Sequence, residues 1–120
     1  MANRIAGVAF LKVDGRQYAL RGSFTVSPSA VEREGIAGQD RVHGFKETPR
    51  VPYISGDLSL VPELSLEELE KITNATVTAE LANGNSYVLR DAWTTAAFEA
   101  DTGEGQVTVK WEGVSCDEIR

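Results

Sequence analysis

Apolar and polar residues alternate along most of this chain, as they do in β-strands that bury one face. The alternation is clearest in residues 54–60, 76–81 and 106–112, where every second residue is apolar or glycine. In the last of these stretches, two valines and Trp111 are separated by polar neighbours. The pattern predicts strands whose apolar side chains pack into a core while their polar side chains face water.

Short turn motifs join these and other strand patterns into hairpins. An Asp-Gly pair at residues 14–15 follows the apolar run 7–13 and precedes a strand pattern at 16–20. Asn-Gly-Asn at residues 83–85 stands between two further strand patterns. Asp-Gly and Asn-Gly favour tight hairpin turns because these residues tolerate positive φ. The sequence therefore predicts two hairpins, and the pattern continues at residues 24–26.

One short helix interrupts the strand patterns. Ser65 is followed three residues later by Glu68, the spacing of a capping box. We expect a helix from about Leu66 to Thr73, with Leu69 facing the core and Asn74 as its stop. A helix of two turns is not stable alone, so it should dock on a sheet.

Together these elements predict a mainly β protein, an antiparallel β-sandwich or barrel with one short flanking α-helix. A length of 120 residues suits a single domain spanning 1–120, and 42% hydrophobic residues are enough for one core. No apolar run approaches the roughly 18 residues of a membrane helix, and the N-terminus lacks the apolar region of a signal peptide. We therefore expect a soluble protein made in a cytoplasm.

The segment 31–50 departs from these patterns. It holds four acids, four bases and glycines at 35, 38 and 44, with few large apolar residues. Twenty residues without a core-forming pattern usually make a functional loop or a segment that a partner orders. We expect a long extended loop, or a hairpin arm that turns around Gly35 to Gly38 and projects beyond the body. A floppy surface loop is the alternative.

The charge of the chain is unevenly distributed. The net charge is -6, which disfavours tight binding of nucleic acid through its phosphates. Residues 1–62 hold eight bases and six acids, whereas residues 63–120 hold four bases and twelve acids. Unlike charge at two ends of a small domain would favour head-to-tail contact between copies. Alternatively, both sets of charges are interspersed in space and solvated.

The sequence gives little support for catalysis. His43 is the sole histidine and lies in the 31–50 segment, while Cys116 is the sole cysteine and precedes acids that would raise its thiol pKa. No metal-ligand spacing or cofactor motif is present. Two pairs of acids, Asp57 with Glu63 and Asp91 with Glu99, could in principle make a glycosidase-like site. A chain with eighteen acids contains such pairs by chance. We therefore predict a protein that is not an enzyme and holds no cofactor or metal.

The order of the motifs resembles the Mu-like bacteriophage tail tube protein family. The resemblance is carried by "VTAELANGNSYVLRDAWTT" followed by "GEGQVTVKWEGVSCDEI". The N-terminal "GVAFLKVDGRQYAL" and the glycine-rich arm also occur in the family's order. The resemblance implies a β-sandwich with a flanking helix, whose subunits form six-membered rings that stack into the tube through which the genome passes.

The resemblance also implies which parts of the chain would meet other molecules. The 31–50 arm would contact neighbouring copies, and the candidate interface residues are Glu32, Arg33, Glu34, Ile36, Asp40, Arg41, His43, Phe45, Lys46 and Arg50. A negative lumen would repel phosphate and let DNA slide, and strand alternation suggests Asp57, Glu80 and Glu112 as lumen-facing acids. Arg90 and Asp91 would lie at strand ends or subunit contacts, while Tyr87, Leu89 and Trp93 would pack.

Partners and location follow from the same resemblance. They are further copies of the chain stacked head to tail, and tail proteins such as sheath, tape measure, terminator and baseplate or tip. DNA would pass through without specific binding, and no membrane would be involved. The protein would belong to the virion tail, assembled in the bacterial host cytoplasm. Three alternatives remain: a tube protein of a phage-tail-like bacteriocin or secretion particle, a monomeric β-barrel binding module, and an enzyme.

Overall fold

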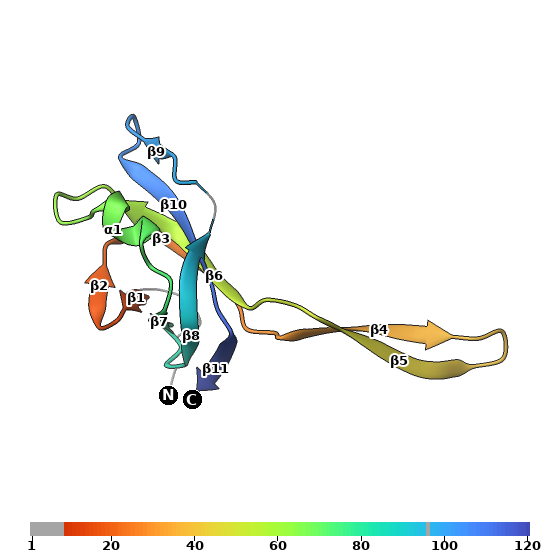
Figure 1. Ribbon diagram of the computed structural model, residues 1–120. Helices are drawn as coiled ribbons and strands as arrows, with labels where there is room; N and C mark the ends of the chain where they lie inside the picture. The colour runs from red at the N-terminus through yellow and green to blue at the C-terminus, as the bar shows by residue number, and fades with distance from the viewer. Residues whose placement is uncertain (1–8, 96) are drawn as a thin grey trace.

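A computed structural model describes residues 9–95 and 97–120, and shows a curled body from which a long two-stranded arm projects (Figure 1). The molecule is therefore extended, measuring 62 × 42 × 27 Å. None of the described helices has the length and apolar character needed to span a membrane. The elements are β1 (Phe10–Val13), β2 (Arg16–Tyr18), β3 (Leu20–Ser27), β4 (Val31–Ala37), β5 (Val42–Pro49), β6 (Tyr53–Ser59), α1 (Leu66–Glu70), β7 (Ala75–Glu80), β8 (Ser86–Thr95), β9 (Ala100–Asp101), β10 (Gln106–Glu112) and β11 (Ser115–Ile119).

The body is one antiparallel sheet that curls into a half-barrel, in the order β2-β1-β7-β8-β10-β6-β3. Strand β8 joins the two halves of the curl. Its first part pairs with β7 and β11, and its last residues pair with β10. The small strand β9 pairs with β10, while β4 and β5 form a separate two-stranded sheet. The predicted fold class, mainly β with one short helix and an extended arm, is confirmed.

The core fills the inside of this curl. Trp111 is fully buried, together with Leu11, Ile54, Leu58, Leu69, Val77, Leu89, Val107 and Val109. The burial of β6, β7 and β10 alternates as their sequences predict. Apolar burial is the main favourable term for a domain of this size, and the curl brings these residues together from strands far apart in the sequence.

The predicted hairpin turns form as expected. Asp14 and Gly15 have φ of 50° and 84° between β1 and β2, and Gly84 has φ of 95° between β7 and β8. Positive φ at both residues 14 and 15 matches the right-handed twist of the flanking strands. Gly7 and Val8, included in the predicted first strand, lie outside the described residues.

The helix begins where the capping box predicts but ends early. The backbone N–H of Glu68 donates to Ser65 Oγ at 3.3 Å, and Leu69 is fully buried. The helix closes at Glu70 instead of Thr73. Two neighbouring interactions explain the early end, because Thr94 of β8 donates its hydroxyl to Leu69 O at 2.7 Å and its N–H to Ile72 O at 3.3 Å. Leu69 O also accepts the Ile72 N–H at 3.2 Å in a tighter turn, so the helix end is held by this turn and by the sheet instead of a further α-helical turn.

Arg90 and Asp91 form a corner in β8. The pairing of β7 with β8 shifts between Ala75 and Val77, so the two residues form a bulge in mid-strand, where Asp91 has φ of 51°. Arg90 Nε donates to Asp117 Oδ2 of β11 at 2.8 Å. The expectation that these residues lie at strand ends is wrong. A bulge bends its strand, and here the bend lies where β8 passes from one half of the curl to the other.

Candidate assembly surfaces

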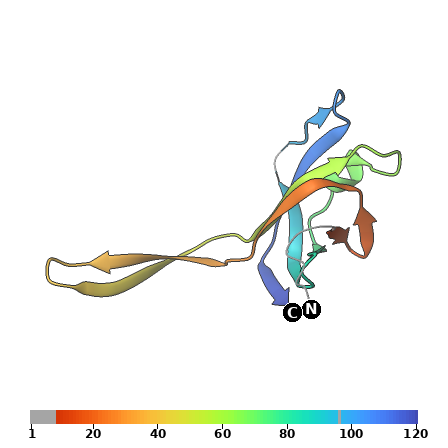
Figure 2. The same cartoon turned by 180° about the vertical axis from the view of Figure 1, so that it is seen from behind.

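The arm is a regular β-ribbon that lies away from the body (Figures 1 and 2). Every residue of β4 and β5 is exposed. The chain turns at residues 38–41, just beyond the predicted Gly35 to Gly38, and Gly38 N–H donates to Arg41 O at 2.8 Å. Glycine fits at position 38 because the His43 ring occupies the space that a Cβ would need. The ladder agrees with the predicted hairpin arm and not with a floppy loop.

The charges of the arm neutralise one another within the ribbon. Arg33 and Glu47 face each other across the ladder with Nε and Oε1 2.7 Å apart, and Lys46 Nζ lies 3.3 Å from Glu34 Oε2. At the tip, Asp40 lies near both Arg41 and His43, at 3.7 and 3.1 Å. Arg50, at the base, donates to Ser29 O at 2.9 Å. With four acids and four bases, the arm has no net charge to attract a partner.

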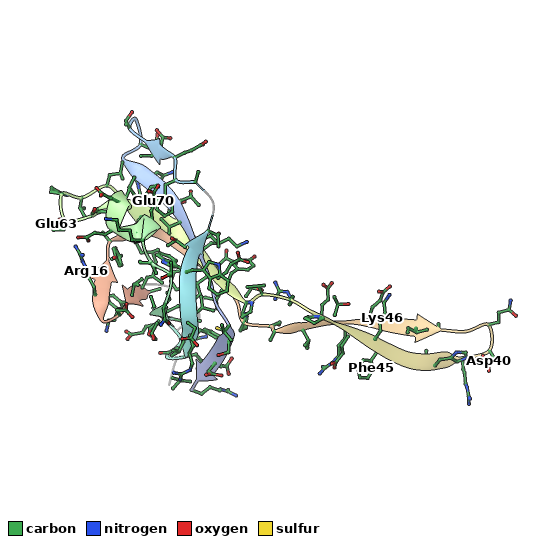
Figure 3. The ribbon with its side chains drawn as sticks, in the orientation of Figure 1. Arg16, Asp40, Phe45, Lys46, Glu63 and Glu70 are labelled. Carbon is green, nitrogen blue, oxygen red and sulfur yellow. The ribbon has the colours of Figure 1, made fainter. Side chains whose placement is uncertain are left out.

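The arm also exposes apolar side chains that its own body does not cover. Phe45 is 61% exposed and Val42, which the sequence patterns did not single out, is 73% exposed. Phe45 and Lys46 project to opposite sides of the ribbon (Figure 3). The Arg33 guanidinium lies 5.5 Å from the centre of the Phe45 ring, on the same face. Ile36, also exposed, lies on the other face. Exposed apolar surface of this kind marks interaction sites.

The charge asymmetry between the two halves of the sequence largely disappears in space. Three bases of the first half pair with acids of the second half in the same chain: Lys12 with Glu80 at 3.2 Å, Arg16 with Glu68 at 3.2 Å, and Arg21 with Glu104 at 3.9 Å. The structure therefore supports interspersed charges instead of oppositely charged ends. Residues 61–71 and 97–105 hold most of the excess negative charge, each with a net charge of -3.

The outer face of β3, β6, β10 and the end of β8 is rich in hydroxyl groups. Asp57 and Glu112 lie on this face, where Asp57 Oδ1 accepts a hydrogen bond from Thr108 Oγ1 at 2.5 Å. Two cations stand among them: Arg21 opposite Asp57, and Lys110, whose Nζ is 4.3 Å from the centre of the Tyr53 ring. The small polar residues of the face are Thr25, Ser27, Ser55, Ser59, Thr95, Gln106 and Thr108. Glu80 lies elsewhere, on β7.

A hollow with a mixed apolar and polar lining opens at the turn between β7 and β8. It has a volume of about 460 Å³ and is lined by Phe10, Glu80, Leu81, Ala82, Gly84, Asn85 and Ser86. Phe10 is 40% exposed, and Ile119, which pairs with Ser86, is 52% exposed. Glu80 stands at the hollow with its carboxylate held by Lys12. Sequence patterns missed this site because β1 and β7 come together from positions about 70 residues apart.

The groups considered for chemistry do not form a reactive site. His43 lies on the exposed arm, and Cys116 is half-buried, with its thiol pKa raised by burial and then by Asp117. Within residues 9–95 and 97–120, no three potential metal-ligating side chains gather. Arg16 donates to Glu63 O at 2.7 Å, so it fixes the loop before α1 (Figure 3). The ionised groups of the body therefore mainly tie its segments together.

Comparisons with known proteins give a consistent picture. A family model described as phage tail tube protein matches residues 2–118. The Mu-like prophage FluMu tail tube protein of Haemophilus influenzae (strain ATCC 51907 / DSM 11121 / KW20 / Rd) is 32% identical over 122 residues, covering 100% of both chains. The tail tube protein of Escherichia phage Mu is 29% identical over 102 residues, covering 85% of this chain and 86% of that one.

Solved structures share the fold at low sequence identity. A sheath/tube terminator structure of an extracellular contractile injection system has a TM-score of 0.66 at 8% identity, with 93% of each chain covered. The anti-feeding prophage cap has a TM-score of 0.67 at 10% identity, with 99% of this chain and 93% of that one covered. The sheath-tube complex of the first system has a TM-score of 0.60 at 10% identity, covering 92% and 87%.

Proposed function

This chain belongs to the phage tail tube protein family, and we propose that it forms six-membered rings that stack head to tail into a tube for phage DNA. The family is structural and not enzymatic, and its members are components of phage tails. Our proposal adds three features to this family membership: the six-membered ring, the head-to-tail stacking of rings and the passage of DNA through the tube.

The observation that carries this proposal is the arm. A two-stranded ribbon with no helix or sheet beneath it cannot bury its apolar side chains, and two-stranded hairpins are at best marginal alone in water. The arm exposes Phe45 and Val42 away from the body (Figure 1). A neighbouring subunit would cover them. Because the arm and its docking surface differ, the same contact can repeat from copy to copy, and a repeated contact of this kind generates rings or filaments.

We assign the lumen to the outer face of β3, β6, β10 and the end of β8. Its hydroxyl-rich surface would stay hydrated, and its acids Asp57 and Glu112 are interspersed with the cations Arg21 and Lys110. A wall without clustered bases would not neutralise phosphates in register, so DNA would pass without sticking. Glu80 lies on β7 beside Lys12 and is not part of this face. Of the three acids suggested by alternation, Asp57 and Glu112 are therefore the two that we place in the lumen.

The surroundings of the tube follow from the relatives. The named structures of the contractile injection system contain a sheath and a terminator. We propose corresponding contacts for this chain, together with a tape measure and a baseplate or tip, in a virion assembled in the host cytoplasm. A tube of a phage-tail-like particle is the second candidate. The phage and prophage relatives, at 29–32% identity, favour the phage over the injection-system proteins, at 8–10%.

Electron microscopy of the purified protein tests the assembly directly. Negative-stain images at increasing protein concentration should show tubes in side view and six-membered rings in end view. Size-exclusion chromatography should show material far larger than 13.0 kDa under the same conditions. A protein that stays monomeric at every concentration would exclude the proposed function and favour a monomeric binding module.

A further inference from the structure

Resting on the proposed tube, we infer that Phe45 of one copy inserts into the hollow between β1 and the β7–β8 turn of a second copy. Phe45 is an aromatic side chain that stays 61% exposed on the ribbon although the Arg33 guanidinium lies over its ring. The hollow is an open site of about 460 Å³ with Phe10, Leu81 and Ala82 in its lining. The partner is therefore a second copy of the chain. Phe45 is the side chain that enters the contact, and the hollow at the β7–β8 turn is the site that receives it.

The occupant must come from another copy because of how the arm is placed. The arm leaves the body and runs away from it, whereas the β7–β8 turn lies at the end of the body near the C-terminus (Figures 1 and 2). Strands rise about 3.4 Å per residue, so the seven residues of β4 extend the arm by roughly 24 Å. The arm points away from the body that carries its own hollow, so in this conformation it can reach only the hollow of another copy.

The charged groups at the two sites are complementary. Arg33 stacks over Phe45 and binds Glu47 at 2.7 Å, so a cation accompanies the ring. At the hollow, the Glu80 carboxylate is 40% exposed and binds Lys12 at 3.2 Å. Docking would place the Arg33 cation next to the Glu80 anion, with each already held by an opposite charge. Complementary charges of this kind fix the orientation of a contact, while the aromatic ring supplies most of its strength.

The alternatives in the described part of the chain fit less well. The hollow near Arg16 and Tyr18 has a volume of about 40 Å³, too small for an aromatic side chain. The second hollow, about 280 Å³, is lined by Ala97 and four polar or charged residues, Thr95, Glu99, Thr108 and Lys110, and it includes part of the proposed lumen face. The hollow at the β7–β8 turn combines sufficient size, three apolar residues in its lining (Phe10, Leu81 and Ala82) and an acid, Glu80, that could meet the incoming arginine.

A disulfide cross-link between two different variants tests the contact. Both proteins carry Cys116→Ala, one also carries Phe45→Cys, and the other also carries Ala82→Cys. The two are mixed and oxidised at more than about tenfold the concentration at which the unaltered protein forms tubes, to offset the loss of the Phe45 ring. We expect a disulfide-linked dimer from the mixture and little from either protein alone. The matched control is Thr48→Cys in place of Phe45→Cys, because Thr48 lies on the opposite face of the arm. Equal cross-linking by the control, or none by the Phe45→Cys variant, would overturn the inference.

Assembly of single variants provides a second readout. Phe45→Ala should raise the protein concentration needed for tubes by about tenfold or more, since a central aromatic contact commonly accounts for such a loss. Ile36→Ala, on the other face of the ribbon, should raise it by less than about threefold, because little of that face enters the hollow. The unaltered protein separates the two proposals. If it forms tubes but no cross-link appears, the docking site is wrong, and if it forms no tubes, the proposed function is wrong.

Discussion

Replacing Gly113 with alanine should destabilise the corner at which β8 passes between the two halves of the curl. Gly113 lies between β10 and β11, and a Cβ there would be 2.8 Å from both Arg90 O and Leu89 Cγ. Neither neighbour can move away easily. The Arg90 carbonyl accepts the Val114 N–H at 3.0 Å, and Leu89 is fully buried. The added methyl group must therefore displace backbone or core.

The expected cost follows from these two contacts. Overpacking a filled core typically costs about 1–3 kcal/mol. Weakening the hydrogen bond from Val114 to Arg90 would add roughly 0.5–1.5 kcal/mol. Together they predict a loss of about 1.5–4.5 kcal/mol of unfolding free energy, a large fraction of the roughly 5–15 kcal/mol typical of a domain.

Urea denaturation followed by tryptophan fluorescence measures this loss, because Trp111 is fully buried in the core. Gly35→Ala is the matched control, since no atom lies within 4 Å of a Cβ at that position on the arm. The control should leave the midpoint of the body unchanged. A Gly113→Ala protein within about 0.5 kcal/mol of the unaltered one, the range of neutral surface changes, would refute the account of the corner.

Leu69→Ala should cost about 2–5 kcal/mol in urea denaturation, because Leu69 is fully buried; an unchanged midpoint would mean that α1 does not support the core. Joining the arm's ends after deleting residues 32–48 should leave a folded body that sediments as a monomer, and tubes from it would contradict the arm's role. Replacing both Asp57 and Glu112 with lysine shifts a six-membered ring by about 24 charge units, so tubes should retain DNA in a salt-dependent way, unlike unaltered tubes. Burial and Asp117 raise the pKa of Cys116, so iodoacetamide should label it more slowly than a free thiol at pH 8, and equally fast labelling would contradict that burial.

Much of the body could be predicted from the sequence, because its signals are local. Alternation places Val107 and Trp111 in the core, the Asp-Gly turn sets the first hairpin, and Ser65 begins the helix. Each of these depends on residues within a few positions of one another. The family also followed from the order of such motifs, and the comparisons confirm it.

The remaining features depend on contacts between distant residues. Nothing around Thr94 indicates that it will bind the end of α1, so the helix was predicted too long. Arg90 and Asp91 were expected at a strand end, but they form a mid-strand bulge where β8 changes partners, and those partners are distant in the sequence. Lys12 and Glu80 are 68 positions apart, so their ion pair, like the hollow beside it, could not be read from composition. Candidate lumen and arm residues stay predictions for the assembled tube.

The charge balance of the arm also determines how temperature should act on the polymer. A contact that buries Phe45 while its ion pairs remain within each ribbon gains little from long-range attraction. Its association should instead show a negative change in heat capacity and, near 25 °C, gain much of its free energy from released water. Apolar contacts of this kind weaken on cooling, and salts such as sulfate strengthen them. Chilling, more than added salt, should therefore return the tube to its subunits.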